Sequence, residues 1–153
     1  MNIFKYFLIT IFISISVQAS DSLYLSCDAT SDTTTYLKNI GSDREIEKLK
    51  LMVEMRFLPD NRLLSINLQS NNPKVTVVSL PNSPEWNAEN YSNDKEFFLK
   101  ITKKENGSRQ DVQVALNRYT GGINYIYTFK DSVGSQTQTV NGKCNKVDLK
   151  KKF

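Results

Sequence analysis

The sequence predicts an all-β protein: a single antiparallel domain of about eight strands, with a small meander barrel preferred over a two-sheet sandwich. Three observations predict this fold. Apolar and polar residues alternate along most of the chain, which is the period of a strand with one buried face. Turn residues separate these stretches at intervals short enough for antiparallel neighbours. Two cysteines lie near the ends of the alternating region, and a bond between them favours a closed or nearly closed sheet.

Residues 1–19 predict a secretory signal peptide. A short segment with one positive charge, Lys5, precedes a mostly apolar run, and small residues lie three and one positions before the point between Ala19 and Ser20. An apolar run of about a dozen residues is too short to span a bilayer, which needs about 20. We therefore expect cleavage between Ala19 and Ser20, a periplasmic or secreted mature protein, and no stable membrane anchor after cleavage.

The alternation begins soon after the expected cleavage point. A first strand carries Leu23, Leu25 and Cys27 on one face, and the polar residues 28–35 that follow predict a loop. Ser42 and Glu45 have the spacing that caps a short helical turn. The clearest strand of the chain then presents five apolar residues on one side: Leu49, Leu51, Val53, Met55 and Phe57.

Turns predicted at residues 58–61 and 71–73 separate two further strands, because Pro, Asp and Asn favour turn conformations. The expected inward residues are Leu64, Ile66 and Leu68 in one strand, and Val75, Val77 and Ser79 in the next. Pro81 and Pro84 then predict an irregular segment that contains Trp86 and Tyr91.

The C-terminal half predicts four strands. The Asn-Gly pair at residues 106 and 107 is a strong hairpin signal, and the Thr-Gly-Gly sequence at residues 120–122 predicts a second tight connection. The inward residues of the first three strands are Phe97, Leu99 and Ile101; Val112, Val114 and Leu116; and Ile123, Tyr125, Tyr127 and Phe129. The last strand is expected from about residue 136 to Cys144.

The two cysteines of the mature chain, Cys27 and Cys144, are expected to form one disulfide, since export carries them to an oxidising compartment. This bond would place the first and last strands side by side, with Cα atoms within about 7 Å. A metal site is not expected, because two isolated thiols in a chain without His cannot build an ordinary zinc site.

The charge distribution gives no sign of nucleic-acid binding. Removal of Lys5 with the signal leaves 19 basic and 16 acidic side chains, a net charge of +3. Three consecutive lysines in a basic tail, residues 150–153, account for that excess, so the β domain at residues 20–149 is close to neutral. A nucleic-acid binder needs a basic surface on the fold itself.

The chain has few candidates for catalysis. It contains no His, which excludes Ser-His-Asp and Cys-His mechanisms. The pairs Glu45/Glu47 and Asp94/Glu96 have the two-residue spacing that places both carboxylates on one face of a strand, as a two-carboxylate glycosidase requires. Charged residues at the start of strands are, however, an ordinary means of keeping sheet edges soluble. We expect a non-enzymatic protein without catalytic residues or a cofactor.

Aromatic residues are concentrated around the strand that follows Gly122. Its members are Tyr119, Tyr125, Tyr127 and Phe129, with Trp86 and Tyr91 upstream. Two interpretations remain open. The aromatic side chains fill the core of the barrel, or they line a cavity for a small apolar ligand or a contact surface for a protein.

Two stretches resemble known proteins. Residues 116–121, Leu-Asn-Arg-Tyr-Thr-Gly, followed by Gly-Lys-Cys at residues 142–144, resemble small secreted proteobacterial proteins of uncharacterised role with an early Cys, an Asn-Arg-x-Thr-Gly turn and a terminal Gly-x-Cys. The likeness covers the first strand and the last thirty or so residues. It implies a secreted protein and no particular activity.

The second resemblance is to the periplasmic inhibitors of C-type lysozyme, which are small eight-stranded barrels. It is carried by the Tyr-Leu-Ser-Cys-Asp sequence at residues 24–28, by Cys144, and by Arg118 and Tyr119. The chain lacks the Ser-Gly-x-Arg-Tyr context and the later Trp-x-Lys-Gly segment that carry inhibition in that family.

These observations predict an exported binding or structural accessory protein of the periplasm. The alternatives are an inhibitor of a hydrolase such as lysozyme, and a carrier of a small apolar ligand. The partner is accordingly an unidentified protein or a small apolar molecule. The expected contact surface includes Arg118, Tyr119 and Trp86.

Overall fold

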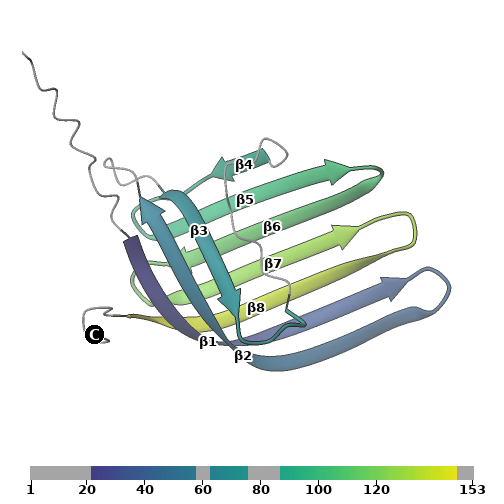
Figure 1. The fold of residues 1–153 in the computed structure, drawn as a ribbon, viewed down its shortest axis with the longest axis horizontal. Helices are drawn as coiled ribbons and strands as arrows, with labels where there is room; N and C mark the ends of the chain where they lie inside the picture. Colours follow the sequence, from purple (N-terminus) through teal and green to yellow (C-terminus); the bar gives the residue numbers. More distant parts are fainter. Residues whose placement is uncertain (1–21, 58–62, 76–86, 148–153) are drawn as a thin grey trace, which may run out of the picture.

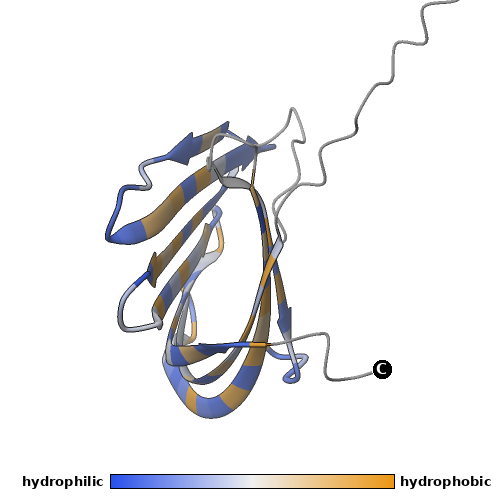
Figure 2. Cartoon of the chain, turned by 90° about the vertical axis from the view of Figure 1, so that its left-hand side faces the viewer, coloured by the Kyte–Doolittle hydropathy of each residue, from blue (hydrophilic) through white to orange (hydrophobic). Residues whose placement is uncertain are grey.

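The computed structural model describes residues 22–57, 63–75 and 87–147, which form one antiparallel sheet of eight strands curled into a half-barrel (Figures 1 and 2). The predicted all-β fold is confirmed. The strands are β1 (Ser22–Leu37), β2 (Gly41–Phe57), β3 (Leu63–Ser70), β4 (Asn87–Asn90), β5 (Glu96–Glu105), β6 (Ser108–Asn117), β7 (Gly122–Lys130) and β8 (Gly134–Lys146).

The strand order is β3-β2-β1-β8-β7-β6-β5-β4. Strands that are consecutive in the chain therefore pair, with the exception of β3 and β4, which are the two edges of the sheet. The first and last strands lie side by side in its middle. The sheet curls so that β4–β7 face β1–β3 across its concave side (Figure 2), and there the ring of Phe57 on β2 lies 5.2 Å from the ring of Phe97 on β5.

The disulfide between Cys27 and Cys144 forms as predicted. The two residues are direct partners in the register of β1 and β8, and their Cα atoms are 3.9 Å apart. The bond links chain segments 117 residues apart, and both cysteines are buried in the core. It therefore joins the N-terminal and C-terminal halves of the sheet at their shared boundary.

The concave side carries the hydrophobic core. The inward residues predicted for the first half of β1, the second half of β2, and β5, β6 and β7 are all buried in this core or packed against it, since a period-two pattern places one set on a single face. The buried residues of the core are Leu25, Cys27, Ala29, Leu49, Leu51, Val53, Met55, Ile66, Leu68, Val75, Leu99, Ile101, Val112, Val114, Leu116, Ile123, Tyr125, Tyr127, Val140 and Cys144.

The loop predicted at residues 28–35 is wrong, because this segment is the second half of β1. It pairs with β2 on one side and with β8 on the other. A backbone paired on both sides satisfies its hydrogen bonds without help from apolar side chains, and threonine favours the extended conformation. The helical turn predicted at Ser42 and Glu45 is also wrong, since both residues lie within β2.

Two predictions fall around the edges of the sheet. The turn predicted at residues 71–73 forms, but it extends to Val75, where a strand was expected to begin; Val75 is buried as expected. The rest of that strand, at residues 76–79, and the turn predicted at residues 58–61 lie outside the described residues. The segment predicted to be irregular contains β4, which pairs with β5 alone. An exposed edge strand of four residues needs little apolar alternation, so the sequence pattern gave no signal for it.

Candidate functional site

The concave face changes from apolar to polar along the length of β1. Ala29 is the last apolar inward residue of β1, and the next inward positions are Ser31, Thr33 and Thr35. Successive inward positions of one strand are about 7 Å apart. The polar part of the concave face therefore extends well beyond the core, toward the far end of the β1–β2 hairpin.

The register of β1 with β2 and β8 arranges these side chains in three rows across the sheet. Each row contains one carboxylate from β2 and one hydroxyl from β1, and two of the rows add an amide from β8. The rows are Glu47–Ser31–Val140, Glu45–Thr33–Gln138 and Asp43–Thr35–Gln136.

A cavity of about 220 Å³ lies over these rows. Its walls come from β1, β2, β8 and the turn after β3, and its lining contains one apolar side chain, that of Val75. The lining residues are Ser31, Thr33, Thr35, Asp43, Glu45, Glu47, Lys74, Val75 and Gln136.

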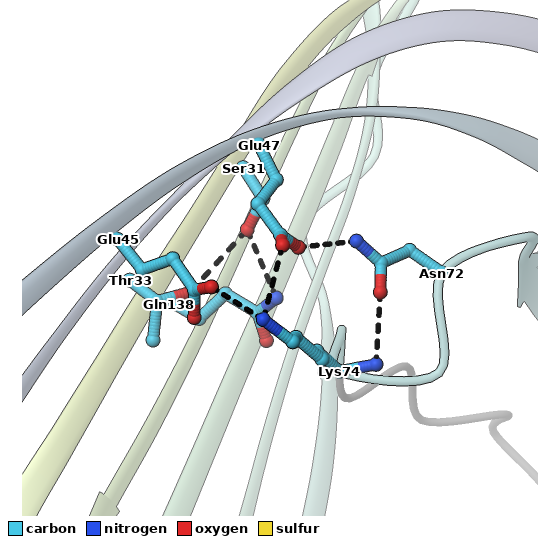
Figure 3. Close-up of polar contacts among 7 residues, drawn as sticks. All are labelled: Ser31, Thr33, Glu45, Glu47, Asn72, Lys74 and Gln138. Carbon is cyan, nitrogen blue, oxygen red and sulfur yellow. Dashed lines mark hydrogen bonds and ion pairs between the residues drawn. The ribbon is translucent and has the colours of Figure 1, made fainter.

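A buried hydrogen bond fixes the floor of the cavity. Ser31 and Gln138 are almost completely buried, with 2% and 1% of their surfaces exposed. The Nε2 of Gln138 donates a hydrogen bond of 3.0 Å to the Oγ of Ser31, and this Oγ lies 3.4 Å from the Oγ1 of Thr33 (Figure 3). Because buried polar groups are costly when unpaired, these contacts hold the floor in one arrangement.

The turn that follows β3 brings one ammonium group into the cavity. The Nζ of Lys74 lies 2.5 Å from the Oε1 of Glu45 and 3.4 Å from the Oε1 of Glu47. Asn72 donates a hydrogen bond from its Nδ2 to the other oxygen of Glu47, and its Oδ1 accepts one from the backbone N–H of Lys74 (Figure 3). Burial of Val75 attaches this turn to the core.

The cavity is negatively charged. Three carboxylates, those of Asp43, Glu45 and Glu47, face one ammonium group, which leaves a net charge of −2 on the lining. The hydrogen bond from Lys74 to Glu45, followed by that to Glu47, raises the pKa of Lys74 above its usual range. Lys74 therefore stays protonated and partly compensates the two glutamates.

The carboxylates are spread along β2 and do not converge on one point. Within residues 22–57, 63–75 and 87–147, no group of three or more His, Cys, Asp or Glu side chains is close enough to hold a metal ion. The arrangement suits hydrogen bonding to an extended polar molecule, because hydroxyls and amides both donate and accept.

The carboxylate pair Glu45/Glu47 lies on one face of a strand, as its spacing predicts. The structure adds Lys74 between the two carboxylates, a contact between residues 27 and 29 positions apart in the chain. The other pair is divided between an exposed loop residue, Asp94, and the first residue of β5, Glu96, and neither lines the cavity.

The predicted contact residues Arg118 and Tyr119 lie on the turn between β6 and β7, away from the cavity. Tyr119 is 77% exposed, and the guanidinium carbon of Arg118 lies 3.8 Å from the centre of the Phe97 ring. This turn contacts Cys144, whose partner on β1 is Cys27. Cys27 is six residues from Thr33 in the middle row of the cavity, so the turn lies roughly 20 Å from that row. Trp86, the third predicted contact residue, lies outside the described residues.

The Asn-Arg-Tyr-Thr-Gly motif has a structural role in this turn. The Oδ1 of Asn117 accepts hydrogen bonds from the backbone N–H groups of Tyr119 and Thr120, at 3.0 and 2.9 Å. Gly121 adopts a φ of +68°, and its carbonyl accepts a hydrogen bond of 2.8 Å from the N–H of Cys144. The motif thus fixes the turn against the strand that carries the disulfide.

The aromatic residues of β7 contribute to the core. Tyr125 and Tyr127 are buried among the inward residues of β6 and β8, and burial raises the pKa of Tyr127 above its usual value. In the part of the chain that the structure describes, this packing favours the core interpretation of the aromatic cluster over a ligand cavity.

The disulfide indicates a non-cytoplasmic, oxidising compartment, because such bonds persist where thiols are not kept reduced. Among the described residues, no helix has the length and apolar character needed to cross a membrane. The expected signal peptide and its cleavage point between Ala19 and Ser20 lie outside the described residues, as does the basic tail.

The chain matches no protein-family model, no curated protein and no solved structure.

Proposed function

We propose that this chain is an exported, non-enzymatic binding protein of the periplasm, and that its polar concave cavity binds a small polar ligand. One observation carries the proposal: three neighbouring strands place hydroxyl, carboxylate and amide side chains around a cavity of about 220 Å³ on the concave face. Ligand sites are concave and use a small number of polar groups to orient the ligand; this cavity is smaller and more polar than most such sites, which restricts its ligand to a small polar molecule.

Export to the periplasm is supported by two independent features. The N-terminal segment has the order of regions typical of a secretory signal, and the disulfide is typical of an oxidising compartment. A role in binding, not catalysis, is supported by the absence of His from the chain, because His is the commonest general base.

The charge of the cavity defines the ligand class. A net charge of −2 on the lining disfavours anions, whereas the hydroxyls of Thr33 and Thr35 and the amide of Gln136 offer both donors and acceptors. A neutral polyol, such as a sugar, or a small amine meets these conditions.

A panel of small molecules tests this function on the disulfide-bonded mature chain. We expect a neutral sugar or a small amine, and not a dicarboxylate, to raise the thermal midpoint, because only the first two complement the lining. Thr33→Val removes one cavity hydroxyl and should weaken binding about three- to tenfold in isothermal titration calorimetry, the effect of one hydrogen bond.

The matched control is Thr34→Val, since Thr34 is the next residue of β1 and is exposed on the opposite face. This variant should bind as the wild type does. Equal weakening by both substitutions, or no shift of the midpoint with any class of compound, would refute the proposed function.

A second candidate function is inhibition of a hydrolase such as lysozyme, and the exposure of Tyr119 favours it. An aromatic side chain on a turn held by Asn117 and Gly121 is a preorganised anchor for another protein. If this function is correct, the mature chain lowers lysozyme activity at stoichiometric concentration, and Tyr119→Ala abolishes the effect. The control is Tyr36→Ala, which removes an exposed tyrosine at the end of β1, far from the β6–β7 turn; this variant should inhibit as the wild type does. A wild type that does not inhibit lysozyme eliminates this candidate.

A further inference from the structure

Apolar side chains are exposed together at the tip of the β1–β2 hairpin. Ile40 is 83% exposed and Val133, on the neighbouring turn between β7 and β8, is 60% exposed, while Tyr36 and Leu37 are exposed beside them. Half of the large hydrophobic residues exposed in the described part of the chain are therefore at one end of the sheet, where Figure 1 shows both turns. We call these four residues and Lys38 the hairpin tip.

The hairpin tip is a preformed surface. The backbone N–H of Lys38 donates a hydrogen bond of 3.0 Å to the carbonyl of Val133, and Leu37 pairs with Gly134 in the register of β1 and β8. A Cβ atom on Gly134 would lie 2.2 Å from the carbonyl oxygen of Tyr36. The two turns are thus packed backbone against backbone, so the backbone positions that carry the apolar side chains are fixed relative to one another.

The shape of the tip determines what it can contact. Its most prominent side chain, Ile40, is almost fully exposed on a turn that closes with a hydrogen bond of 3.1 Å from its own N–H to the carbonyl of Leu37. A projecting residue of this kind cannot enclose a ligand. It can only insert into a deformable partner or into a pocket of complementary shape.

The charges around the tip are mostly basic. Lys38 lies between the exposed apolar residues, and Lys130 ends β7 beside them. The one carboxylate of the β7–β8 turn, Asp131, accepts hydrogen bonds from the backbone N–H groups of Val133 and Gly134 at 2.8 and 2.9 Å. Two ammonium groups against one carboxylate leave a net charge of +1.

The next charged residues along the hairpin, Asp32, Asp43 and Arg44, cancel this excess, but they lie behind the tip, on the paired part of β1 and β2. Asp32 is held by a bidentate pair with Arg44, at 2.6 and 2.9 Å, and Asp43 faces the concave cavity. Projecting aliphatic side chains, a tyrosine and flanking lysines together match the interface of an anionic bilayer. Aliphatic groups enter the acyl boundary, tyrosine lies at the level of the headgroups, and lysine is attracted by anionic lipid.

We propose that the hairpin tip docks on anionic phospholipid membranes. Ile40, Leu37 and Val133 enter the interface, and Lys38 and Lys130 meet the lipid phosphates. Binding through so few apolar side chains is reversible, like that of other peripheral proteins with a single weak anchor. The polar cavity has no part in this contact, so the inference does not depend on the ligand-binding function.

Vesicle sedimentation of the disulfide-bonded mature chain tests the inference. We expect the protein to sediment with vesicles of equal amounts of phosphatidylcholine and phosphatidylglycerol, and to remain in solution with phosphatidylcholine alone. Ile40→Asp should weaken sedimentation about tenfold or more, because it replaces the most exposed apolar group by a carboxylate. Lys38→Gln should weaken it less and reduce its dependence on salt.

The matched control is Ile46→Asp. Ile46 is also exposed on β2, but it lies five residues from Gly41, roughly 17 Å along the strand, and should have no effect. Thermal midpoints equal to that of the wild type will show that both variants are folded. The inference is overturned if the wild type sediments with neither vesicle, or if Ile46→Asp is as damaging as Ile40→Asp. Capture of a protein partner that depends on Ile40, without vesicle binding, also overturns it.

Discussion

Reduction of the Cys27–Cys144 disulfide is expected to lower the thermal midpoint by about 10–20 °C while the strands remain formed. The bond closes a loop across a sequence separation of 117 residues, for which the loss of entropy in the unfolded chain gives on the order of 4–5 kcal/mol as an upper figure. In a domain of this size, 1 kcal/mol changes the midpoint by roughly 3–6 °C. Far-ultraviolet circular dichroism should retain its β-sheet signal, because backbone pairing across β1 and β8 does not require the sulfur bond.

A matched variant separates the crosslink from the packing of its atoms. Both sulfurs are buried, so reduction requires transient unfolding and must be verified by counting free thiols. The double substitution Cys27→Ala/Cys144→Ala removes the crosslink permanently and should lower the midpoint at least as much as reduction does. A midpoint that is unchanged after complete reduction would contradict a stabilising role for the bond.

Gly121→Ala is expected to reduce the free energy of unfolding by roughly 3 kcal/mol or more. A Cβ atom at this position would lie 2.4 Å from the carbonyl oxygen of Cys144, and φ is +68°, where an L-residue costs about 1–2 kcal/mol. The carbonyl cannot move away easily, because Cys144 is joined to Cys27 and donates its N–H to Gly121. Overpacking of this kind adds about 1–3 kcal/mol.

The control for this prediction is Gly107→Ala in the β5–β6 turn. Gly107 also has a positive φ, of +81°, but no atom lies within 4 Å of a Cβ placed there. This variant should therefore lose only the conformational part, about 1–2 kcal/mol. Urea denaturation of both variants measures the difference, and equal losses would show that the contact with Cys144 carries no energy.

Most strands could be predicted because their residues carry their own signal. In the second half of β2 and in β7 every second residue is apolar, and these residues are inward in the structure, from Leu49 to Phe57 and from Ile123 to Tyr127. The Asn-Gly hairpin at residues 106 and 107 forms with positive φ at both positions, as its type requires. Local chemistry is sufficient in these cases, since the pattern and the turn residues act within a few positions.

The second half of β1 could not be predicted in the same way. Its inward residues are Ser31, Thr33 and Thr35, so the alternation of polarity that marks a strand is absent from residues 31–35. Pairing with β2 and β8 stabilises the segment. The polarity pattern of the segment itself shows neither pairing, and β8 is about 100 residues away in the chain. The error had a direct consequence, because these three residues supply the hydroxyls of the candidate site.

Part of the candidate site could be predicted from the sequence. The spacing of Glu45 and Glu47 places their carboxylates on one face, and the structure has them there. Lys74, Gln136 and Gln138 carry no comparable signal, because they come from a turn and a strand that are 27 to 93 positions away. The hydrogen bond between Ser31 and Gln138 joins residues 107 positions apart.

The sequence by itself determined an all-β chain, the inward faces of most strands, the tight turns and the pairing of two cysteines. These properties depend on the polarity of alternate residues, on the conformations that Gly and Asn permit, and on the presence of just two thiols in the mature chain. Only the tertiary structure decided that the pair β1 and β8 lies in the middle of an open half-barrel, that a polar cavity continues the core, and that two turns form one apolar tip. Each of these depends on which strands pair and in which register, across long distances in the chain. The backbone groups that form these pairs are the same in every residue, so the sequence of one strand does not show its partner.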